Sequence, residues 1–310
     1  MNILVTGATG FIGAALVSRL AEGGHRVRRL RRGPRGGDGE PTWNPETGQV
    51  HLDDALPIDA VIHLAGESIA QRWTPAAKAR IRSSRVEATL LLSKALARLS
   101  QPPRVMVCAS ATGFYGDRAG EVLDEQSQPG VGFLAETCRA WEAASDPARQ
   151  SGVRVVNLRL GIVLARHAGA LAKMLPAFRL GLGGRLGSGG QYWSWIALDD
   201  LMRVVELALL DDRMNGPVNA VAPQSPTNRE FTASLSRALH RPAFLPMPAL
   251  FARALFGEMA REALLASAQV RPKRLLESGF TFLFPELDAA LPHLLGAEPQ
   301  KQLQVSRNRL

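Results

Sequence analysis

Short apolar runs alternate with longer amphipathic stretches over the first half of this sequence. Apolar runs of four to seven residues predict strands, and stretches whose apolar residues recur every three or four positions predict helices. We expect strands at 2–6, 26–30, 60–64, 104–109 and 153–158, and helices at 11–22, 75–99 and 133–150. Because strands that alternate with helices form βαβ units, this order predicts a parallel sheet with helices on both faces.

The pattern loosens after Arg159. Segment 181–191 holds six glycines in eleven residues, and 33–45 is rich in Gly and Pro, so both predict loops. Further helices are expected at 168–178, 199–210 and 227–239, the last with Ser225 or Thr227 as its N-cap, and short strands at 218–221 and 279–284. From Arg241 on, prolines separate short helices.

These elements predict a Rossmann-type, doubly wound α/β fold with a second, smaller part. We expect a dinucleotide-binding domain over 1–158, completed by about 196–221. A smaller, irregular α+β substrate-side domain is expected over 159–195 and 222–300, followed by a tail at 301–310. In such folds the ligands lie at the carboxyl ends of the strands, so a small-molecule substrate is expected between the two parts.

A glycine-rich turn joins the first strand to the first helix. Gly7 would allow the tight turn, Gly10 would let the backbone approach a pyrophosphate, and Gly13 would let the helix pack closely on the strand. The helix N-terminus offers free N–H groups and a partial positive charge to phosphates. The turn therefore predicts dinucleotide binding, with contacts expected from Gly7, Thr9, Gly10, Phe11, Ile12 and Gly13.

The residues at the end of the second strand indicate which dinucleotide binds. An NAD site has a carboxylate there for the ribose 2′-hydroxyl, but no Asp or Glu lies between Glu22 and Asp38. Arg31 and Arg32 stand in its place, and two guanidinium groups suit a 2′-phosphate. We therefore expect NADP(H), although these arginines could also do no more than solvate an exposed strand end.

Composition and charge exclude several other classes. The chain has 310 residues, 46% of them apolar, and two cysteines, Cys108 and Cys138, which make neither a disulfide framework nor a metal cluster. Its net charge of +9 comes mostly from scattered arginines without interleaved stacking aromatics, so we expect no nucleic-acid partner. With no secretory signal and no apolar run long enough to span a bilayer, we expect a cytoplasmic protein without a membrane partner.

Several motifs resemble those of the extended short-chain dehydrogenase/reductases, the sugar-nucleotide epimerase family. The first three are the glycine turn at 6–13, Val-Ile-His-Leu-Ala-Gly at 61–66 and Ser-Ala-Thr-Gly-Phe-Tyr-Gly at 110–116. Others resemble an atypical epimerase-like subgroup that has a C-terminal segment of unassigned function. They lie at 66–69, 72–73, 81–85, 191–196, 199–201, 216–223, 240–242 and 270–280. The resemblance extends to about residue 295, and members have been labelled as epimerases or as cell-division inhibitors.

The resemblance implies further cofactor contacts beyond the glycine turn. Two strand ends would line the nicotinamide side, and a basic residue on the following helix, Arg85, would reach a phosphate or form a structural salt bridge. Glu67 would act as an acid near the nicotinamide or cap the next helix. The expected set is Leu64, Ala65, Gly66, Glu67, Arg85, Ala109, Ser110, Leu160, Gly161 and Ile162.

The family's catalytic Tyr-x-x-x-Lys pair is missing from this chain. The two tyrosines, Tyr115 and Tyr192, are followed four residues later by Ala and Ile. If Trp141-Glu142 is aligned with the end of the family's active-site helix, Leu134 and Cys138 fall where the pair should be. Leu134 has no ionisable proton, and a cysteine on an apolar helix is more often a core residue than a nucleophile.

Three hydroxyl groups are the remaining candidates for catalysis. Ser110 or Thr112 matches the family's substrate-orienting hydroxyl, and Tyr115 is the nearest phenol, unless its ring packs under the substrate without donating a proton. Tyr192, Trp193 and Trp195 follow the second glycine loop, where they would clamp a substrate by stacking or pack the two parts together. Two functions remain: an NADP(H)-dependent oxidoreductase or epimerase-like enzyme, and a catalytically silent NADP(H)-binding sensor or regulator.

Overall fold

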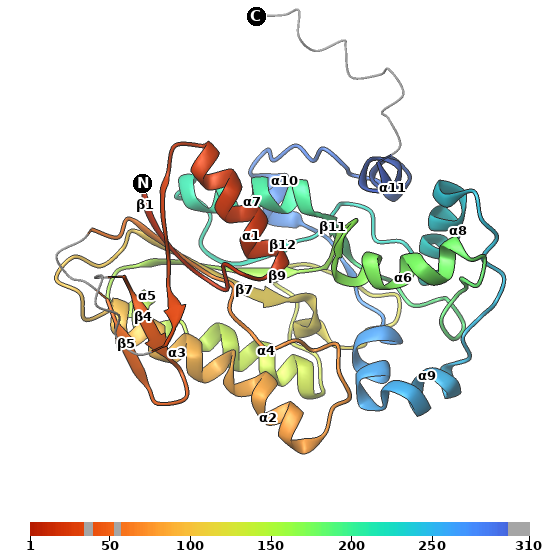
Figure 1. Ribbon diagram of the computed structural model, residues 1–310, viewed down its shortest axis with the longest axis horizontal. Helices are drawn as coiled ribbons and strands as arrows, with labels where there is room; N and C mark the ends of the chain where they lie inside the picture. Colours follow the sequence, from red (N-terminus) through yellow and green to blue (C-terminus); the bar gives the residue numbers. More distant parts are fainter. Residues whose placement is uncertain (34–39, 53–56, 297–310) are drawn as a thin grey trace, which may run out of the picture.

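The chain folds around a six-stranded, fully parallel sheet (Figure 1). A computed structural model describes residues 1–33, 40–52 and 57–296. The strands lie in the order β12-β9-β7-β6-β1-β2, and each neighbouring pair is parallel. Their bounds are β1 Asn2–Thr6, β2 Arg26–Arg29, β6 Ala60–His63, β7 Val105–Ala111, β9 Arg154–Leu160 and β12 Gly216–Ala220. The predicted doubly wound α/β fold is confirmed.

The sheet continues past its β2 edge through a small three-stranded sheet. After Leu30 the chain forms β3 (Arg31–Arg32), which pairs in parallel with β4 (Thr42–Asn44), and β4 pairs antiparallel with β5 (Gln49–His51). The predicted loop at 33–45 is therefore wrong at its described end, while residues 34–39 lie outside the described residues. The residue in this segment that could have indicated ordered structure is Trp43. Its ring is buried and meets the edge of the His63 ring.

Helices cover both faces of the sheet (Figure 1). On one face α1 (Phe11–Glu22) and α7 (Leu198–Leu210) pack through Leu16, Leu20 and Leu201 onto the apolar side chains of β1, β7 and β9. On the other face α3 (Val86–Leu96) and α5 (Asp146–Gln150) pack through Leu92 and Ala148 against Leu4 and Met106. Burial of large apolar side chains on both faces is the main stabilising contribution to this sandwich.

Two long helices that we predicted are each divided in the structure. The helix expected at 75–99 is α2 (Pro75–Ser83) followed by α3, because the Ser84 hydroxyl bonds the Ile81 carbonyl and accepts the Glu67 N–H. The helix expected at 133–150 is α4 (Phe133–Ala143) followed by α5, whose start holds a proline. The first break lies beside Glu67, just after the end of β6.

A second core lies among α6 (Gly169–Arg179), α8 (Asn228–Leu239) and α11 (Leu287–Leu295). Thr227 caps α8 as predicted and forms a reciprocal capping box with Glu230. The strand expected at 279–284 is wrong, because the N–H groups of Leu283 and Phe284 bond the buried Asp200 carboxylate instead. The glycine-rich segment 181–191 forms no helix or named strand, as predicted.

The remaining described elements are short. They are η1 Thr112–Tyr115, β8 Val122–Leu123, β10 Ile162–Ala165, β11 Trp195–Ala197, α9 Ala249–Phe256, the π-helix η2 Ala260–Leu264, β13 Gln269–Val270 and α10 Lys273–Glu277. β10 pairs with β11, and β13 pairs with β8, so two-stranded ladders bring residues near 122 and 270 together. The predicted division into two domains stays a prediction, and the expected tail at 301–310 lies outside the described residues.

Candidate functional site

The glycine turn lies at the carboxyl end of β1, pressed against the end of β6. Gly7 has a φ of +68°, and a Cβ there would stand 2.7 Å from the carbonyl carbon of Leu64. A side chain at Gly13 would collide with the Gly7 carbonyl oxygen, so α1 can begin this close to the strand only with glycine at position 13. Both positions match the roles that the spacing predicts.

The N-terminus of α1 has no side-chain cap. Gly10 is its N-cap residue, and no side chain among the described residues bonds the first N–H groups of the helix. Thr9 and Gly10 are exposed, Phe11 reaches across to Gly169 at the start of α6, and Ile12 packs into the core. Uncapped N–H groups at an exposed helix N-terminus bind phosphate well.

Arg31 and Arg32 lie on β3, beyond the carboxyl end of β2. Both are exposed, and Arg31 pairs with Glu40 through a 3.1 Å contact between Nε and Oε2. More than half of the Arg31 side chain and half of the Glu40 side chain remain in solvent, so this pair is weak. The two guanidinium groups therefore remain available to a phosphate bound near the carboxyl end of β2.

A buried polar chain links the ends of β1 and β6 to two helices. The Nδ1 atom of His63 lies 2.7 Å from Thr6 Oγ1, and its Nε2 atom lies 2.9 Å from Thr89 Oγ1 on α3. Thr89 Oγ1 also accepts from the Trp141 indole of α4, and Thr6 Oγ1 accepts from the Ala65 N–H. Complete burial lowers the pKa of His63 to about 4, so the ring is neutral near pH 7.

Arg85 turns from the break between α2 and α3 toward the end of β6. Its guanidinium bonds the Ile81 carbonyl, lies over the Trp141 ring, and would stand 3.4 Å from a Cβ at Gly66. Burial lowers its pKa, and it forms no ion pair with a carboxylate within the described residues. Glu67 instead contacts Gln71 and Arg80, and the structural salt bridge that we considered for Arg85 is absent there.

At the end of β7 the structure commits Ser110 to a buried ion pair. The Ser110 hydroxyl donates to Glu142 Oε1 at 2.7 Å, and Arg159 on β9 bonds the same carboxylate through two nitrogens. Burial opposes the charged form of Arg159, but the bonds to Glu142 raise its pKa overall. Ser110 is 2% exposed, so this hydroxyl faces the protein interior.

Tyr115 extends the same buried network. Its hydroxyl accepts from Arg159 at 2.9 Å and shares its proton between Asn219 Oδ1 and the Asp124 carbonyl. Burial raises the pKa of Tyr115 to about 12, although the nearby Arg159 charge lowers it. The geometry favours the packing role that we weighed for this ring. The sequence analysis did not find the ion pair between Arg159 and Glu142. The feature that could have indicated it is Arg159 itself, a charged residue inside an otherwise apolar strand.

Thr112 is the half-buried hydroxyl at the end of β7. Its Oγ1 forms no hydrogen bond with any described residue, so it is available to a ligand. Leu134 and Cys138 line the adjacent helix face, since a Cβ at Gly113 would stand 3.3 Å from the Leu134 Cβ and 3.9 Å from the Cys138 sulfur. Burial and the Glu142 charge raise the pKa of Cys138 to about 12, so its thiol stays protonated.

The C-terminal segment supplies the missing cap of α4. The start of α4 has no side-chain cap of its own, and Glu262 of η2 accepts the Leu134 N–H at 3.0 Å. Lys78 of α2 pairs with Glu258, one turn before Glu262, which ties the same segment to α2 as well as to α4. Sequence reasoning could not find this contact, because 128 residues separate its partners.

The carboxyl ends of β7 and β9 lie together. Leu160 pairs with Ala111, Ala109 pairs with Leu158, and Gly161 is held by the Ala220 carbonyl. A Cβ at Gly161 would meet the Ser194 carbonyl at 2.7 Å, and Ile162 begins β10. The structure therefore places the predicted residues of β1, β6, β7 and β9 at one edge of four neighbouring strands.

The tryptophans after the second glycine loop belong to the core. Trp193 and Trp195 are buried with Phe231 of α8, and the Trp193 indole donates to the Leu264 carbonyl. Only Tyr192 is partly exposed. A stacking clamp made by the two tryptophans is therefore wrong, because both rings pack inside the core between α6 and α8; the alternative, that they pack the two parts together, stays a prediction.

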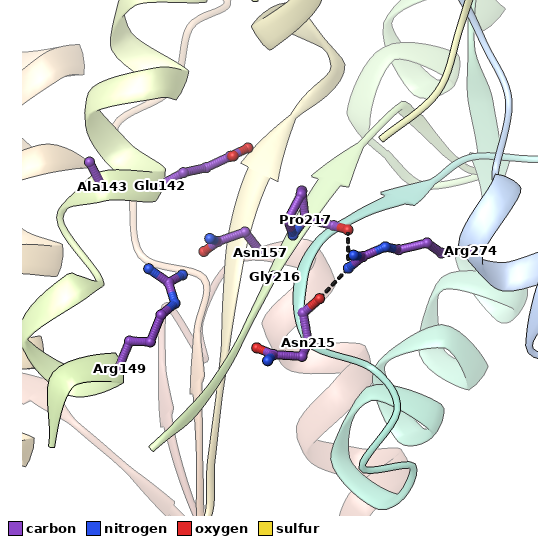
Figure 2. Close-up of a pocket in the computed structure, with 8 residues that line it drawn as sticks. All are labelled: Glu142, Ala143, Arg149, Asn157, Asn215, Gly216, Pro217 and Arg274. Carbon is purple, nitrogen blue, oxygen red and sulfur yellow. Dashed lines mark hydrogen bonds between the residues drawn. The ribbon is translucent and has the colours of Figure 1, made fainter. Parts of the chain in front are cut away.

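One cavity of about 470 Å³ opens beside the middle of β9 and the start of β12 (Figure 2). Glu142 and Arg149 line one wall, Asn157 projects from the middle of β9, and Arg274 is held by the carbonyls of Asn215 and Pro217. Asn157 lies mid-strand and Gly216 begins β12, so most of the lining lies short of the strand ends, while Glu142 reaches the end of β7 through its hydrogen bond with Ser110.

The sequence matches a known family and a second, uncharacterised domain. Residues 3–220 match the NAD dependent epimerase/dehydratase family, and residues 247–294 match DUF1731, a domain of unknown function. The second match includes α9 and η2, and therefore the Glu262 cap.

Similar proteins occur in bacteria and animals, and the alignments cover nearly the whole length of both chains. The chain is 42% identical over 291 residues to an epimerase family protein of Mycobacterium tuberculosis, covering 93% of this chain and 96% of that protein. It is 39% identical over 299 residues to the human epimerase family protein SDR39U1, covering 95% of this chain and all of that protein. A crystal structure of human SDR39U1 (isoform 2) with NADPH superposes with a TM-score of 0.86 at 38% identity, covering 95% of this chain and 99% of that one.

Proposed function

The chain belongs to the NAD dependent epimerase/dehydratase family, and from this premise we propose that it binds NADP(H) and acts as an oxidoreductase or epimerase-like enzyme on a small-molecule substrate. The observation that carries the proposal is the exposed, uncapped N-terminus of α1 beside Arg31 and Arg32. An open helix N-terminus suits the pyrophosphate, and two guanidinium groups suit a 2′-phosphate. The NADPH in the human SDR39U1 structure supports the same choice of dinucleotide.

The fit of the dinucleotide is tested by a cation at the strand ends that has no ion-pair partner among the described residues. Arg85 is a half-buried cation that has no carboxylate partner within ion-pair distance among the described residues, and it lies against Gly66 at the end of β6. An anion at this strand end would satisfy that charge, since a buried guanidinium is costly without one. We therefore assign Arg85 to a phosphate or ribose contact, beside the backbone of Leu64 and Ala65.

The substrate side is proposed at the ends of β7 and β9. A bound nicotinamide supplies the hydride chemistry, so the protein has to orient the substrate, exclude water and supply a proton. Thr112 offers the free hydroxyl of the three catalytic candidates, while Ser110 and Tyr115 hold the strand ends in place through Glu142 and Arg159. Leu134 makes the helix wall apolar where the family has its phenol.

Nucleotide titration tests the cofactor assignment. Replacement of Arg31 and Arg32 by alanine should weaken NADPH binding about tenfold or more and leave NADH binding unchanged, because only NADPH has the 2′-phosphate. The control is Arg29→Ala, an exposed arginine at the end of β2 that precedes the proposed contact. Equal loss for both nucleotides, or no loss for either, would refute the assignment.

A catalytically silent NADP(H)-binding protein is the second candidate. It is favoured by the commitment of Ser110 and Tyr115 to buried partners and by the protonated, buried Cys138. Oxidation of NADPH should be followed with a panel of aldehydes and ketones. Turnover that falls at least tenfold in Thr112→Val supports the enzyme. Tight NADPH binding without oxidation of the cofactor by any member of the panel supports the silent protein.

A further inference from the structure

An exposed apolar surface lies on the C-terminal side of the molecule, away from the nucleotide turn. Of thirteen large apolar side chains that stand exposed in the described part of the chain, seven belong to three neighbouring segments. These are Leu180 and Leu182 after α6, Phe244 and Leu245 before α9, and Leu250, Phe251 and Leu255 on α9 itself. Each exposes between 46% and 78% of its surface, and together we call them the apolar patch.

Backbone contacts hold the three segments side by side. Leu245 N–H bonds the Gly183 carbonyl, Leu186 forms a bridge with Met247, and a Cβ at Gly187 would stand 3.5 Å from the Ala249 Cβ at the start of α9. In Figure 1, α9 lies at the margin of the molecule below α6 and α8. Within α9 only Ala252 is buried, so a helix of eight mostly apolar residues presents most of its surface to solvent.

The stretches of chain that form the apolar patch carry charge of one sign. No Asp or Glu occurs between Asp146 and Asp199 or from Phe231 to Gly257, and these stretches supply the patch. These stretches also contribute basic side chains next to the apolar patch. Four of them, all exposed, are Arg179, Arg185, Arg241 and Arg253. No ion pair holds any of these four within the described ranges.

A pocket of about 490 Å³ adjoins the patch. Arg185 and Arg229 line it together with Thr232 and the exposed ring of Phe244. The side chain of Arg229 bonds only the Ser188 carbonyl among the described residues. Arg237 also lines the pocket but is paired with Asp288, so two of its three guanidinium groups stand beside an apolar surface without a carboxylate in the described part of the chain. This combination suits the phosphate of an amphiphile whose apolar chains continue across the patch.

Two partners could cover such a surface, a second copy of the chain or a lipid bilayer, and the charge pattern favours the bilayer. A two-fold symmetric contact with a second copy would bring the same patch against itself, and the arginine rims would face each other with like charge. An anionic bilayer instead offers phosphates to the arginines and an acyl layer to protruding Leu and Phe side chains. The expectation of no membrane partner rested on span length, and indeed no described helix is long and apolar enough to cross a membrane.

We propose that the apolar patch and its arginines attach this protein to the surface of anionic lipid bilayers. The face of α9 with Leu250, Phe251 and Leu255 enters the boundary between headgroups and acyl chains, and the pocket at Arg185 and Arg229 holds one lipid phosphate. The attachment is peripheral, and it weakens as salt rises because the arginine contacts are screened.

Vesicle flotation with the full chain tests the proposal. Vesicles of phosphatidylcholine with about 30% phosphatidylglycerol should capture the protein in low salt, and vesicles of phosphatidylcholine alone should not. Arg185→Gln and Arg253→Gln should each weaken capture about five-fold, as expected for one arginine near an anionic surface. Leu250→Asp combined with Phe251→Asp should weaken it about a hundred-fold, because two exposed apolar side chains lose their insertion.

The matched control is Leu210→Asp, which adds the same charge to an exposed leucine at the end of α7. It should be captured like the unaltered protein, and circular dichroism should show that all variants keep their fold. Equal capture of control and patch variants would overturn the proposal, as would no capture by anionic vesicles. Concentration-dependent dimers that the patch variants abolish, without capture by vesicles, would assign the patch to self-association instead.

Discussion

The buried His63 makes stability depend on pH in a way that can be calculated. Its pKa falls from 6.5 to about 4 on folding because the ring is completely buried. Between these values the unfolded chain binds a proton that the folded chain does not, so stability falls as pH drops from about 7 toward 4. From pH 7.5 to pH 5 the loss worked from the two pKa values is about 2 kcal/mol.

The assay is urea unfolding at pH 7.5, 6 and 5, with the unaltered protein compared to His63→Gln. Carboxylates also titrate in this range, so the measured quantity is the difference in pH dependence between the two proteins. The variant should lose about 2 kcal/mol less than the unaltered protein between pH 7.5 and 5. His167→Gln, at an exposed position, is the control and should keep the full dependence. Identical pH dependence in His63→Gln and the unaltered protein would refute the buried, neutral histidine.

Three further predictions concern the same edge of the sheet. Gly7→Ala should lower the free energy of unfolding by about 1–3 kcal/mol, measured by urea titration, because φ is +68° and the backbone of Leu64 leaves no room for a Cβ; an unchanged midpoint would contradict the close approach. Tyr115→Phe should cost about 1–3 kcal/mol by leaving Asn219 and Arg159 with fewer partners, while NADPH affinity stays within about twofold in a fluorescence titration. Cys138 should resist iodoacetamide at pH 8 in the folded protein, since burial raises its pKa to about 12, and mass spectrometry of intact protein would reveal rapid labelling if the thiol were accessible.

Some features of the site follow from short stretches of sequence. The turn at Gly7 and Gly13 is predictable because each glycine answers a local backbone requirement within one strand, one turn and one helix. Arg31 and Arg32 are predictable by their position at the end of the second strand. The N-cap at Thr227 follows from a pattern of four residues.

Other features depend on segments that are distant in sequence. The break at Ser84 depends on the Glu67 N–H of a preceding loop, and the failure of the strand at 279–284 depends on Asp200. Trp43 stands in a stretch whose glycines and prolines indicate a loop. In the structure it nevertheless packs against the ring of His63 and into the apolar core. No local pattern contains these partners, so local propensity is overridden.

The sequence by itself determined the cofactor turn, the parallel sheet and the absence of the Tyr-x-x-x-Lys pair, because backbone conformation, periodicity and residue identity are properties of short windows. Only the tertiary structure decided which hydroxyl is free. Ser110 and Tyr115 are occupied by Glu142, Arg159 and Asn219, and Thr112 is not. A side chain's burial and partners are set by elements that are distant in sequence: Asn219, the partner of Tyr115, lies 104 residues away, and this contact exists only once the whole fold has formed.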